Sequence, residues 1–302
     1  MTNPAPSPAP APSPAERIST PVDGVDVLGA ISPSRAGDFM SCPLLYRFRT
    51  IDRLPEQPSP DAVRGTVVHK VLEDLFDLPA LDRTPERAGQ MLVPAWDVLL
   101  ETEPALAGMF GGEGPDVATW LTSCRTVLDR YFELEDPRRL EPADRELYVE
   151  ALLDSKLLLR GFVDRIDVAP DGRIRVVDYK SGRSPGVGYE AKALFQMKFY
   201  ALVIWRLRGV VPSMLQLIYL GNGEILRYEP DEADLLATER KVEAVWAAIR
   251  LAQETGDWQP NPSRLCDWCS HHQFCPTKGG TLPPLPERAA PTPDVSTDES
   301  AD

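Results

Sequence analysis

Two acidic residues and a lysine lie on neighbouring segments that have the pattern of a β-hairpin. Residues 169–173 separate the two segments and contain Pro, Asp and Gly, which are typical of a turn. If these five residues form the turn, Asp164 lies directly opposite Asp178. Lys180 is two residues beyond Asp178 and shares its face, whereas Asp167 faces the other way. The hairpin therefore predicts two carboxylates and an amine in one patch.

Such a patch could hydrolyse a phosphodiester. Two opposed carboxylates, Asp164 and Asp178, suit a hard cation such as Mg²⁺ or Mn²⁺, and the main-chain carbonyl of Tyr179 could be a third oxygen ligand. The cation would neutralise developing charge and acidify an attacking water. Lys180 would orient or deprotonate that water, or stabilise the transition state. The alternative interpretation is a solvated hairpin face with incidental charges.

Three further polar residues lie on predicted helices. His69 belongs to a helix of about residues 60–78, where a histidine beside apolar neighbours is more often a packed core residue. Gln196 and Tyr200 belong to an apolar helix of about residues 191–207. They are four residues apart and therefore share a helix face. By themselves they could equally be a polar residue at the core edge and a core aromatic.

The cysteines form a second chemical set. An odd number of cysteines, three of them within ten residues, indicates reduced metal ligands rather than a disulfide framework. The candidate thiolates are Cys266, Cys269 and Cys275, and a fourth ligand must come from elsewhere in the chain. Four thiolates suit a [4Fe-4S] cluster. Zn²⁺ is the alternative, with four thiolates or with His271 or His272. Unconnected buried cysteines are a third reading, and Cys124 is expected to be a core residue.

The remaining pattern predicts an α/β domain at about residues 28–276. A helix is expected from Pro33 to about Arg49, and a helical insertion at about residues 80–150. A second hairpin turns at residues 221–223, and a long helix of about residues 231–255 precedes the cysteine cluster 266–275. The Pro-rich residues 1–27 and the acidic, Pro-rich residues 277–302 are expected to be disordered tails.

Charge is distributed unevenly. The net charge is −14, but residues 71–150 carry −11 of it and residues 151–276 are neutral. Because phosphate binding depends on the local field, this acidity does not exclude a nucleic-acid substrate. The sequence contains neither an apolar run long enough for a membrane span nor a phosphate-binding loop for ATP. We therefore expect a cytoplasmic protein without membrane association.

The hairpin segments 161–167 and 176–182 resemble the second and third motifs of the PD-(D/E)XK nucleases, specifically of the RecB-like exonuclease branch. Residues 64–69 resemble the upstream helix of this branch, where a glycine precedes a metal-binding histidine, and residues 196–200 resemble its glutamine-x-x-x-tyrosine motif. The resemblance implies a restriction-endonuclease-like core, a mixed sheet flanked by helices. It also implies a Mg²⁺-dependent DNA exonuclease of DNA repair or recombination, with sites at His69, Asp164, Asp178, Tyr179, Lys180, Gln196 and Tyr200.

The same resemblance implies the iron–sulfur set. In iron–sulfur members of this branch, one cysteine near the N-terminus joins three near the C-terminus around a [4Fe-4S] cluster. The resemblance therefore implies that Cys42 joins Cys266, Cys269 and Cys275, and it favours iron over zinc here. Larger members fuse a helicase to the nuclease module, so this chain would work alone or with a helicase or other repair protein in trans. A catalytically silent iron–sulfur DNA-binding module and a partner subunit of a helicase–nuclease complex remain alternatives. The arginines Arg35, Arg47, Arg49 and Arg53 are candidates for DNA-backbone contacts.

Overall fold

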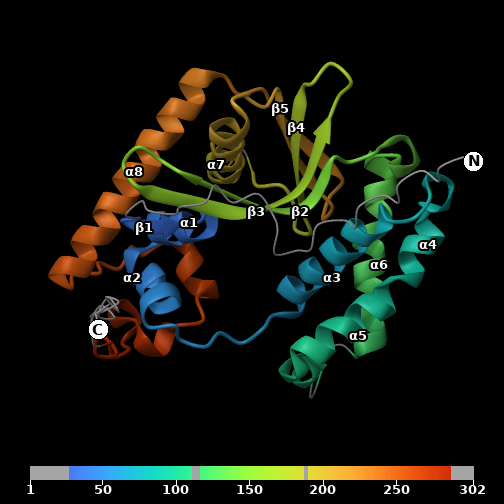
Figure 1. Cartoon of the computed structure of the whole chain (residues 1–302). Helices are drawn as coiled ribbons and strands as arrows, with labels where there is room; N and C mark the ends of the chain where they lie inside the picture. Colours follow the sequence, from blue (N-terminus) through green and yellow to red (C-terminus); the bar gives the residue numbers. More distant parts are fainter. Residues whose placement is uncertain (1–26, 111–115, 187–189, 287–302) are drawn as a thin grey trace, which may run out of the picture. The chain divides into compact units, whose positions relative to one another are not determined.

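The computed structural model describes residues 27–110, 116–186 and 190–286 (Figure 1). The segments expected to be disordered at residues 1–26 and 287–302 lie outside this range. The chain divides into two compact units. The larger contains the residues up to Gly37 together with residues 57–248, and the smaller contains residues 38–56 together with those from Ile249 onward.

The larger unit is built on a mixed six-stranded sheet in the order β1-β3-β4-β5-β6, with β2 paired to β3. β1 is parallel to β3 and β4 is parallel to β5, whereas the other pairs are antiparallel. This is the mixed sheet flanked by helices that the sequence predicts. The strands are β1 (Gly29–Ile31), β2 (Asp144–Leu152), β3 (Leu157–Val168), β4 (Ile174–Lys180), β5 (Met214–Tyr219) and β6 (Glu224–Tyr228).

The central strand β3 has an interrupted edge. One edge pairs with β2 along residues 158–166. The other edge pairs with β1 at residues 157–159 and with β4 only at residues 165–168. Residues 160–164 therefore lie between these two pairings, where β3 and β4 separate. A gap of this kind leaves room for side chains within the sheet.

Helices cover both faces of the sheet in the larger unit (Figure 1). The helices between Pro60 and Leu134 form a helical block, and Val177 and Tyr179 of β4 share a core with this block. The helix α7 instead packs on the face of Asp178, through Gln196. The first helix of the block begins at a Ser59 cap followed by Pro60. The helices are α3 (Pro60–Leu75), α4 (Pro85–Gln90), α5 (Leu92–Thr102), α6 (Val117–Leu134), α7 (Glu190–Arg208) and α8 (Glu232–Thr255), which continues into the smaller unit, with short turns at 80–82, 104–110 and 137–139.

The N-terminal helix differs from the prediction. We expected one helix from Pro33 to about Arg49, but α1 (Pro33–Ser41) ends before Cys42, and α2 (Pro43–Tyr46) and a π turn (Arg47–Ile51) follow. Cys42 is extended, with φ −164° and ψ 112°. The cause is Pro43, because a proline disfavours helical geometry in the residue before it.

The smaller unit is held by aromatic packing and polar contacts. Phe39, Tyr46 and Trp258 form edge and stacked ring contacts. Three short 3₁₀ turns follow, at Arg264–Trp268, His272–Phe274 and Pro276–Lys278. Residues 277–286 of the segment that we expected to be disordered lie within the described part of the chain, and there Arg47 donates to the carbonyl of Pro283.

Within the described part of the chain, no helix is long and apolar enough to cross a membrane. Cys124 is fully buried in the core of α3, α5 and α6, as expected. Burial also raises the pKa of its thiol to about 11, so this cysteine stays protonated.

Candidate metal and nuclease site

The hairpin has the predicted register. Val168 pairs with Ile174 and Arg165 with Val177. Beyond Arg165 the two backbones separate, and the side chain of Asp164 occupies the space between them. Its Oδ2 accepts a hydrogen bond of 2.7 Å from the backbone N–H of Tyr179. The pairing of β3 with β4 therefore ends one residue before the position at which we predicted Asp164 to lie opposite Asp178.

Asp178 and Lys180 are in contact on β4. Lys180 Nζ lies 2.6 Å from Asp178 Oδ2. Gln196 of α7 joins the pair, because its Nε2 donates to Asp178 Oδ1 and its Oε1 accepts from Lys180 Nζ, both at 3.0 Å. Tyr200, one turn further along α7, has its hydroxyl 3.5 Å from Gln196 Nε2. The structure thus brings these four predicted residues together.

Gly161 explains how α7 approaches the strands so closely. A Cβ at this position would lie 2.8 Å from the ring of Tyr200, closer than real side chains come. A residue larger than glycine would therefore push α7, and Gln196 with it, away from β3. Gly65 has a similar role on α3, where a Cβ would lie 3.0 Å from Ser181 Oγ.

His69 of α3 lies beside the carboxylate of Asp164. Its Nδ1 lies 3.5 Å from Asp164 Oδ2. This contact favours the interpretation of His69 as a residue that faces the acidic site over its interpretation as a packed core residue. His69 also makes an edge contact with the ring of Tyr179, with ring centroids 6.0 Å apart.

Glu146 is a site residue that the sequence analysis missed. It lies on β2, opposite Asp164, since the flanking residues Arg145 and Leu147 pair with Arg165 and Val163. Its Oε1 is 3.9 Å from His69 Nδ1. Ligand atoms of His69, Glu146 and Asp164 lie within 4.8 Å of one another. Glu146 also has φ +42°, a left-handed backbone that is strained for a non-glycine residue.

A sequence signal for Glu146 exists. Residues 145–152 read Arg-Glu-Leu-Tyr-Val-Glu-Ala-Leu, in which polar and apolar side chains largely alternate. This period of two is typical of a half-buried strand. We assigned no strand there, and so Glu146 was left out.

The electrostatics of the cluster are unfavourable in the absence of a cation. Burial, and then the charge of Asp164, raises the pKa of Glu146 to about 7. Burial, and then the charge of Asp178, holds the pKa of Asp164 well above its usual range. Burial lowers the pKa of His69, which favours the neutral imidazole that binds metals. These shifts favour the uncharged forms of Glu146, Asp164 and His69, as expected for ionisable groups that are buried close together.

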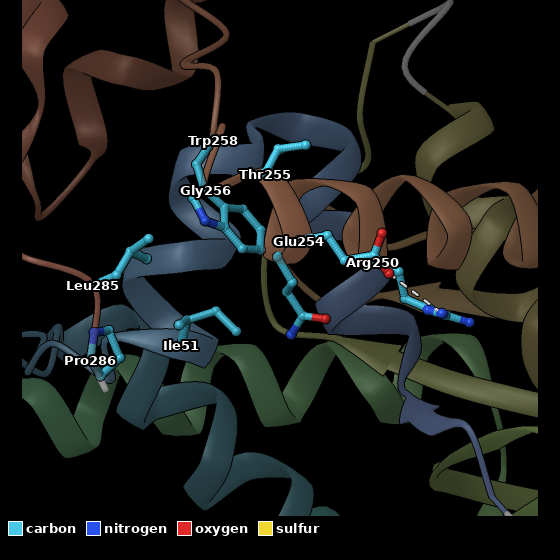
Figure 2. Close-up of a pocket in the computed structure, with 9 residues that line it drawn as sticks. Ile51, Arg250, Glu254, Thr255, Gly256, Trp258, Leu285 and Pro286 are labelled. Carbon is cyan, nitrogen blue, oxygen red and sulfur yellow. Dashed lines mark hydrogen bonds and ion pairs between the residues drawn. The ribbon is translucent and has the colours of Figure 1, made fainter. Parts of the chain in front are cut away.

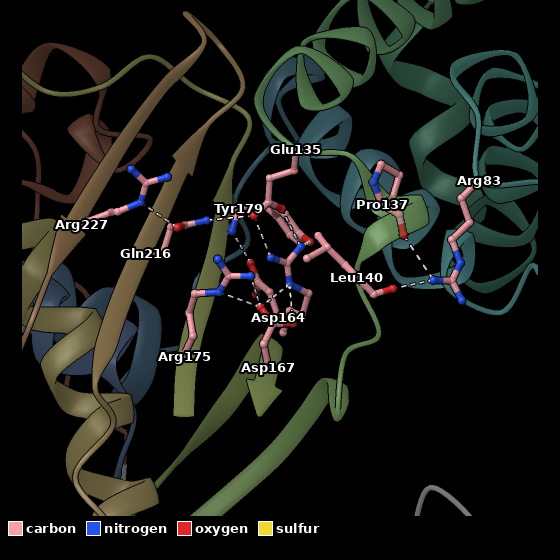
Figure 3. Close-up of polar contacts among 11 residues, drawn as sticks. Arg83, Glu135, Pro137, Leu140, Asp164, Asp167, Arg175, Tyr179, Gln216 and Arg227 are labelled. Carbon is pink, nitrogen blue, oxygen red and sulfur yellow. Dashed lines mark hydrogen bonds and ion pairs between the residues drawn. The ribbon is translucent and has the colours of Figure 1, made fainter. Parts of the chain in front are cut away.

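The opposite face of the same strands carries a closed network of charges (Figure 3). Arg165 is fully buried and donates from Nη1 and Nη2 to Glu135, at 2.8 and 3.0 Å, and from Nη1 to the hydroxyl of Tyr179, at 2.6 Å. Gln216 donates to Glu135 at 3.0 Å. Asp167 accepts from Arg165 on this face, as the register predicts. Arg165 directly follows Asp164, so the network fixes the strands behind the acidic cluster.

A cavity of about 510 Å³ adjoins the cluster. His69 and Glu146 line it, together with Phe162 of β3, whose side chain is 53% exposed. Phe162 makes a ring contact with Tyr148 across the β2–β3 pair, with centroids 5.2 Å apart. The cluster is therefore open to a ligand from this side.

The four predicted cysteine ligands all belong to the smaller unit. Burial raises the pKa of Cys269, and the charges of Cys275, Cys266 and Cys42 raise it further, which shows that all four lie within electrostatic range. The sulfur atoms of Cys42 and Cys266 accept backbone N–H groups of Asn261 and Ser263, at 3.4 and 3.3 Å. In the described part of the chain, no three of these sulfurs lie within 4.8 Å of one another.

The histidines beside the cysteines have other partners. His271 is 1% exposed, and its Nε2 lies 2.7 Å from Glu56 Oε1. Nε2 of His272 contacts the carbonyl of Cys266. Arg47 is also buried, in an ion pair with Asp52, so it is not available for the DNA contact that we considered. Arg49 pairs with Asp38 and Glu56.

The smaller unit also contains a cavity of about 650 Å³ (Figure 2). Trp258 and Leu285 line it, with Ile51 and the end of α8. It has one exposed ion pair, Arg250 with Glu254, and no cluster of metal-binding side chains among its lining residues.

Comparisons with known proteins identify the fold. Residues 30–276 match the family model of the PD-(D/E)XK nuclease superfamily, and the chain belongs to this superfamily. It is 27% identical over 203 residues to the gene 69 protein of Mycobacterium phage D29, covering 59% of this chain and 70% of that protein. It is 23% identical over 287 residues to the gene 69 protein of Mycobacterium phage L5, covering 81% and 95%.

A solved structure has the same fold. A candidate exonuclease from Eubacterium rectale superposes with a TM-score of 0.52 at 14% identity, covering 80% of this chain and 87% of that one.

Proposed function

We propose that this member of the PD-(D/E)XK nuclease superfamily is a Mg²⁺- or Mn²⁺-dependent deoxyribonuclease that degrades DNA from an end, in repair or recombination. The observation that carries the proposal is the cluster of His69, Glu146 and Asp164 beside the Asp178–Lys180 pair. The two carboxylates are the oxygen ligands that Mg²⁺ and Mn²⁺ prefer, and the imidazole is a ligand that suits Mn²⁺ better than Mg²⁺. The raised pKa values of Glu146 and Asp164 fit a cation, because a cation would relieve the crowding of acids.

Each residue has a defined part in this proposal. Glu146, Asp164 and His69 would hold the cation, with Asp178 and the carbonyl of Tyr179 as further oxygen donors. The bound cation would neutralise charge on the phosphate and acidify a water. Lys180 keeps its ammonium in the site because Gln196 Oε1 accepts from it, and from there it would stabilise the transferred phosphate or the attacking oxygen. Gln196 positions both Asp178 and Lys180.

The direct test is digestion of end-labelled single- and double-stranded DNA, and of closed circular DNA, with Mg²⁺, Mn²⁺, Ca²⁺ or EDTA. An exonuclease releases short products progressively from the end and spares the circle. Lys180→Ala and Asp178→Ala should abolish cleavage while leaving DNA binding in Ca²⁺ nearly unchanged. Asp171→Asn, in the exposed turn of the same hairpin, is the matched control. DNA binding without cleavage would instead indicate a catalytically silent binding module.

We further propose that Cys42, Cys266, Cys269 and Cys275 hold a [4Fe-4S] cluster. Backbone N–H groups on two of the sulfurs support thiolate ligands. The contacts of His271 and His272 with Glu56 and Cys266 speak against a zinc site completed by histidine.

A further inference from the structure

Phe162 is a large apolar side chain in an unusual place. It lies on β3 two residues before Asp164, it is 53% exposed, and it lines the cavity that His69 and Glu146 also line. Its ring contact with Tyr148 orients it but leaves half of it open to solvent. Burying such a surface on a ligand is favourable. The exposed ring therefore provides a flat apolar surface beside the candidate metal site.

The first part of the cavity wall on α3 is made of small residues, Ala62, Gly65 and Thr66. His69, Lys70 and Glu73 line the rest of this wall, further along the same helix. The cavity thus lies between α3 and the strand that carries Phe162. Its volume of about 510 Å³ is within the roughly 300–1,000 Å³ typical of small-ligand sites. A flat heterocycle therefore has room beside Phe162.

The side chains of β3 that lead up to Asp164 have chemistry that suits the phosphates and bases of a nucleic-acid strand. Arg160, Phe162 and Asp164 are each two residues apart, so successive side chains of this set lie about 6–7 Å apart along the strand. A cation, an aromatic ring and a metal-binding carboxylate then follow one another. Cations contact phosphates, and aromatic rings stack on bases without regard to sequence.

We propose that Phe162 is the stacking platform for one base of the DNA strand that is cut, next to the scissile phosphate, and that the site therefore takes a strand whose base at this point is unpaired. A base within a duplex is already stacked on both sides, so it reaches Phe162 only when the strand is single or its end is open. This inference rests on the proposed nuclease function and names the form of its substrate.

The test uses the full-length protein and a set of single-stranded oligonucleotides in which one abasic nucleotide is moved along the strand. Binding is measured by fluorescence anisotropy in Ca²⁺, and cleavage in Mg²⁺. Phe162→Leu keeps an apolar side chain but removes the ring, and Phe162→Trp restores a larger ring. Val168→Ala, at another exposed apolar position of β3, is the control. Thermal melting checks that each variant is folded.

Phe162→Leu should weaken binding and raise KM about 10-fold, within the roughly 5- to 150-fold that one stacked base contributes, with kcat changed less than threefold. One abasic position should cause the same loss in the parent protein and none in Phe162→Leu, and Phe162→Trp should bind like the parent. An open or single-stranded end should be preferred over a blunt duplex.

Equal effects of every abasic position, or equal binding by Phe162→Leu and its parent, would overturn the inference. Failure of the parent protein to cleave any DNA would instead overturn the proposed function. The binding measurement in Ca²⁺ needs no cleavage, so it decides the stacking role in either case.

Discussion

Replacing Glu146 with glutamine should stabilise the metal-free protein. Glu146 is buried beside Asp164, and together these raise its pKa from 4.5 to about 7. Such a shift corresponds to about 3 kcal/mol for a fully shielded group. Because 29% of this side chain is exposed, solvent and salt screen part of the interaction. We therefore expect Glu146→Gln to raise the free energy of unfolding by about 1–2 kcal/mol at pH 8.

The sign follows from the raised pKa of Glu146. Below about pH 4.5 the carboxyl is protonated in both the folded and the unfolded protein, so it does not affect stability. Between pH 4.5 and 7 the unfolded chain ionises first, and the folded protein loses stability as the pH rises. Above pH 7 the full loss is present. The gain in Glu146→Gln should therefore grow from pH 5 to pH 7 and then level off.

Urea denaturation in EDTA at several pH values measures this difference, and a second series with Mg²⁺ measures what the cation restores. The parent should gain more stability from Mg²⁺ than Glu146→Gln does, since the variant has lost a ligand. Glu150→Gln is the matched control on the same strand, four residues away, and its glutamine can still accept from the hydroxyl of Tyr148. A variant that is less stable than the parent in EDTA at pH 8, or equally stabilised by Mg²⁺, would refute the reasoning.

Three other substitutions test the rest of the structure. Arg165→Met should lower the free energy of unfolding by about 3–5 kcal/mol by leaving Glu135 buried without its cation, and adding Glu135→Leu should recover part of the loss in urea denaturation; no recovery would argue against a direct pair. Cys42→Ser should lose the roughly four irons per chain, the absorbance near 400 nm and much of the thermal stability, whereas Cys124→Ser should keep them; parent protein that is colourless and contains zinc would exclude the iron–sulfur proposal. Gln196→Leu should slow cleavage about 10- to 100-fold with DNA binding in Ca²⁺ unchanged, because it frees Asp178 and Lys180; a rate within twofold of the parent would exclude this positioning role.

The parts of the site that were predictable are local in the sequence. The hairpin register follows from a five-residue turn and the alternation of strand side chains, and the structure confirms it as far as the pair Arg165–Val177. The resemblance placed Gln196 and Tyr200 together on the helix that follows the strands, as a pair that contacts DNA, and in the structure Gln196 contacts Asp178 and Lys180. In both cases a short connection leaves few ways to arrange the segments.

The parts that were missed depend on single residues and on a strand that the sequence analysis did not assign. Pro43 breaks the predicted N-terminal helix, and its effect falls on Cys42, one of the proposed cluster ligands. Glu146 enters the site through the antiparallel pairing of β2 with β3, two consecutive strands joined by residues 153–156. A strand pattern at residues 145–152 could have indicated β2, but the left-handed backbone of Glu146 has no such local cause.

The two faces of β3 and β4 are electrostatic opposites, and their shared backbone connects them. On one face Glu146, Asp164 and Asp178 lie close together, and the pKa values of Glu146 and Asp164 are raised, which disfavours their ionisation. On the other face Arg165 is satisfied by Glu135 and Tyr179. Arg165 directly follows Asp164, and the backbone N–H of Tyr179 binds the Asp164 carboxylate. The satisfied network behind the strands can therefore hold an acidic cluster in front of them, in the arrangement that the proposed metal-dependent hydrolysis would use.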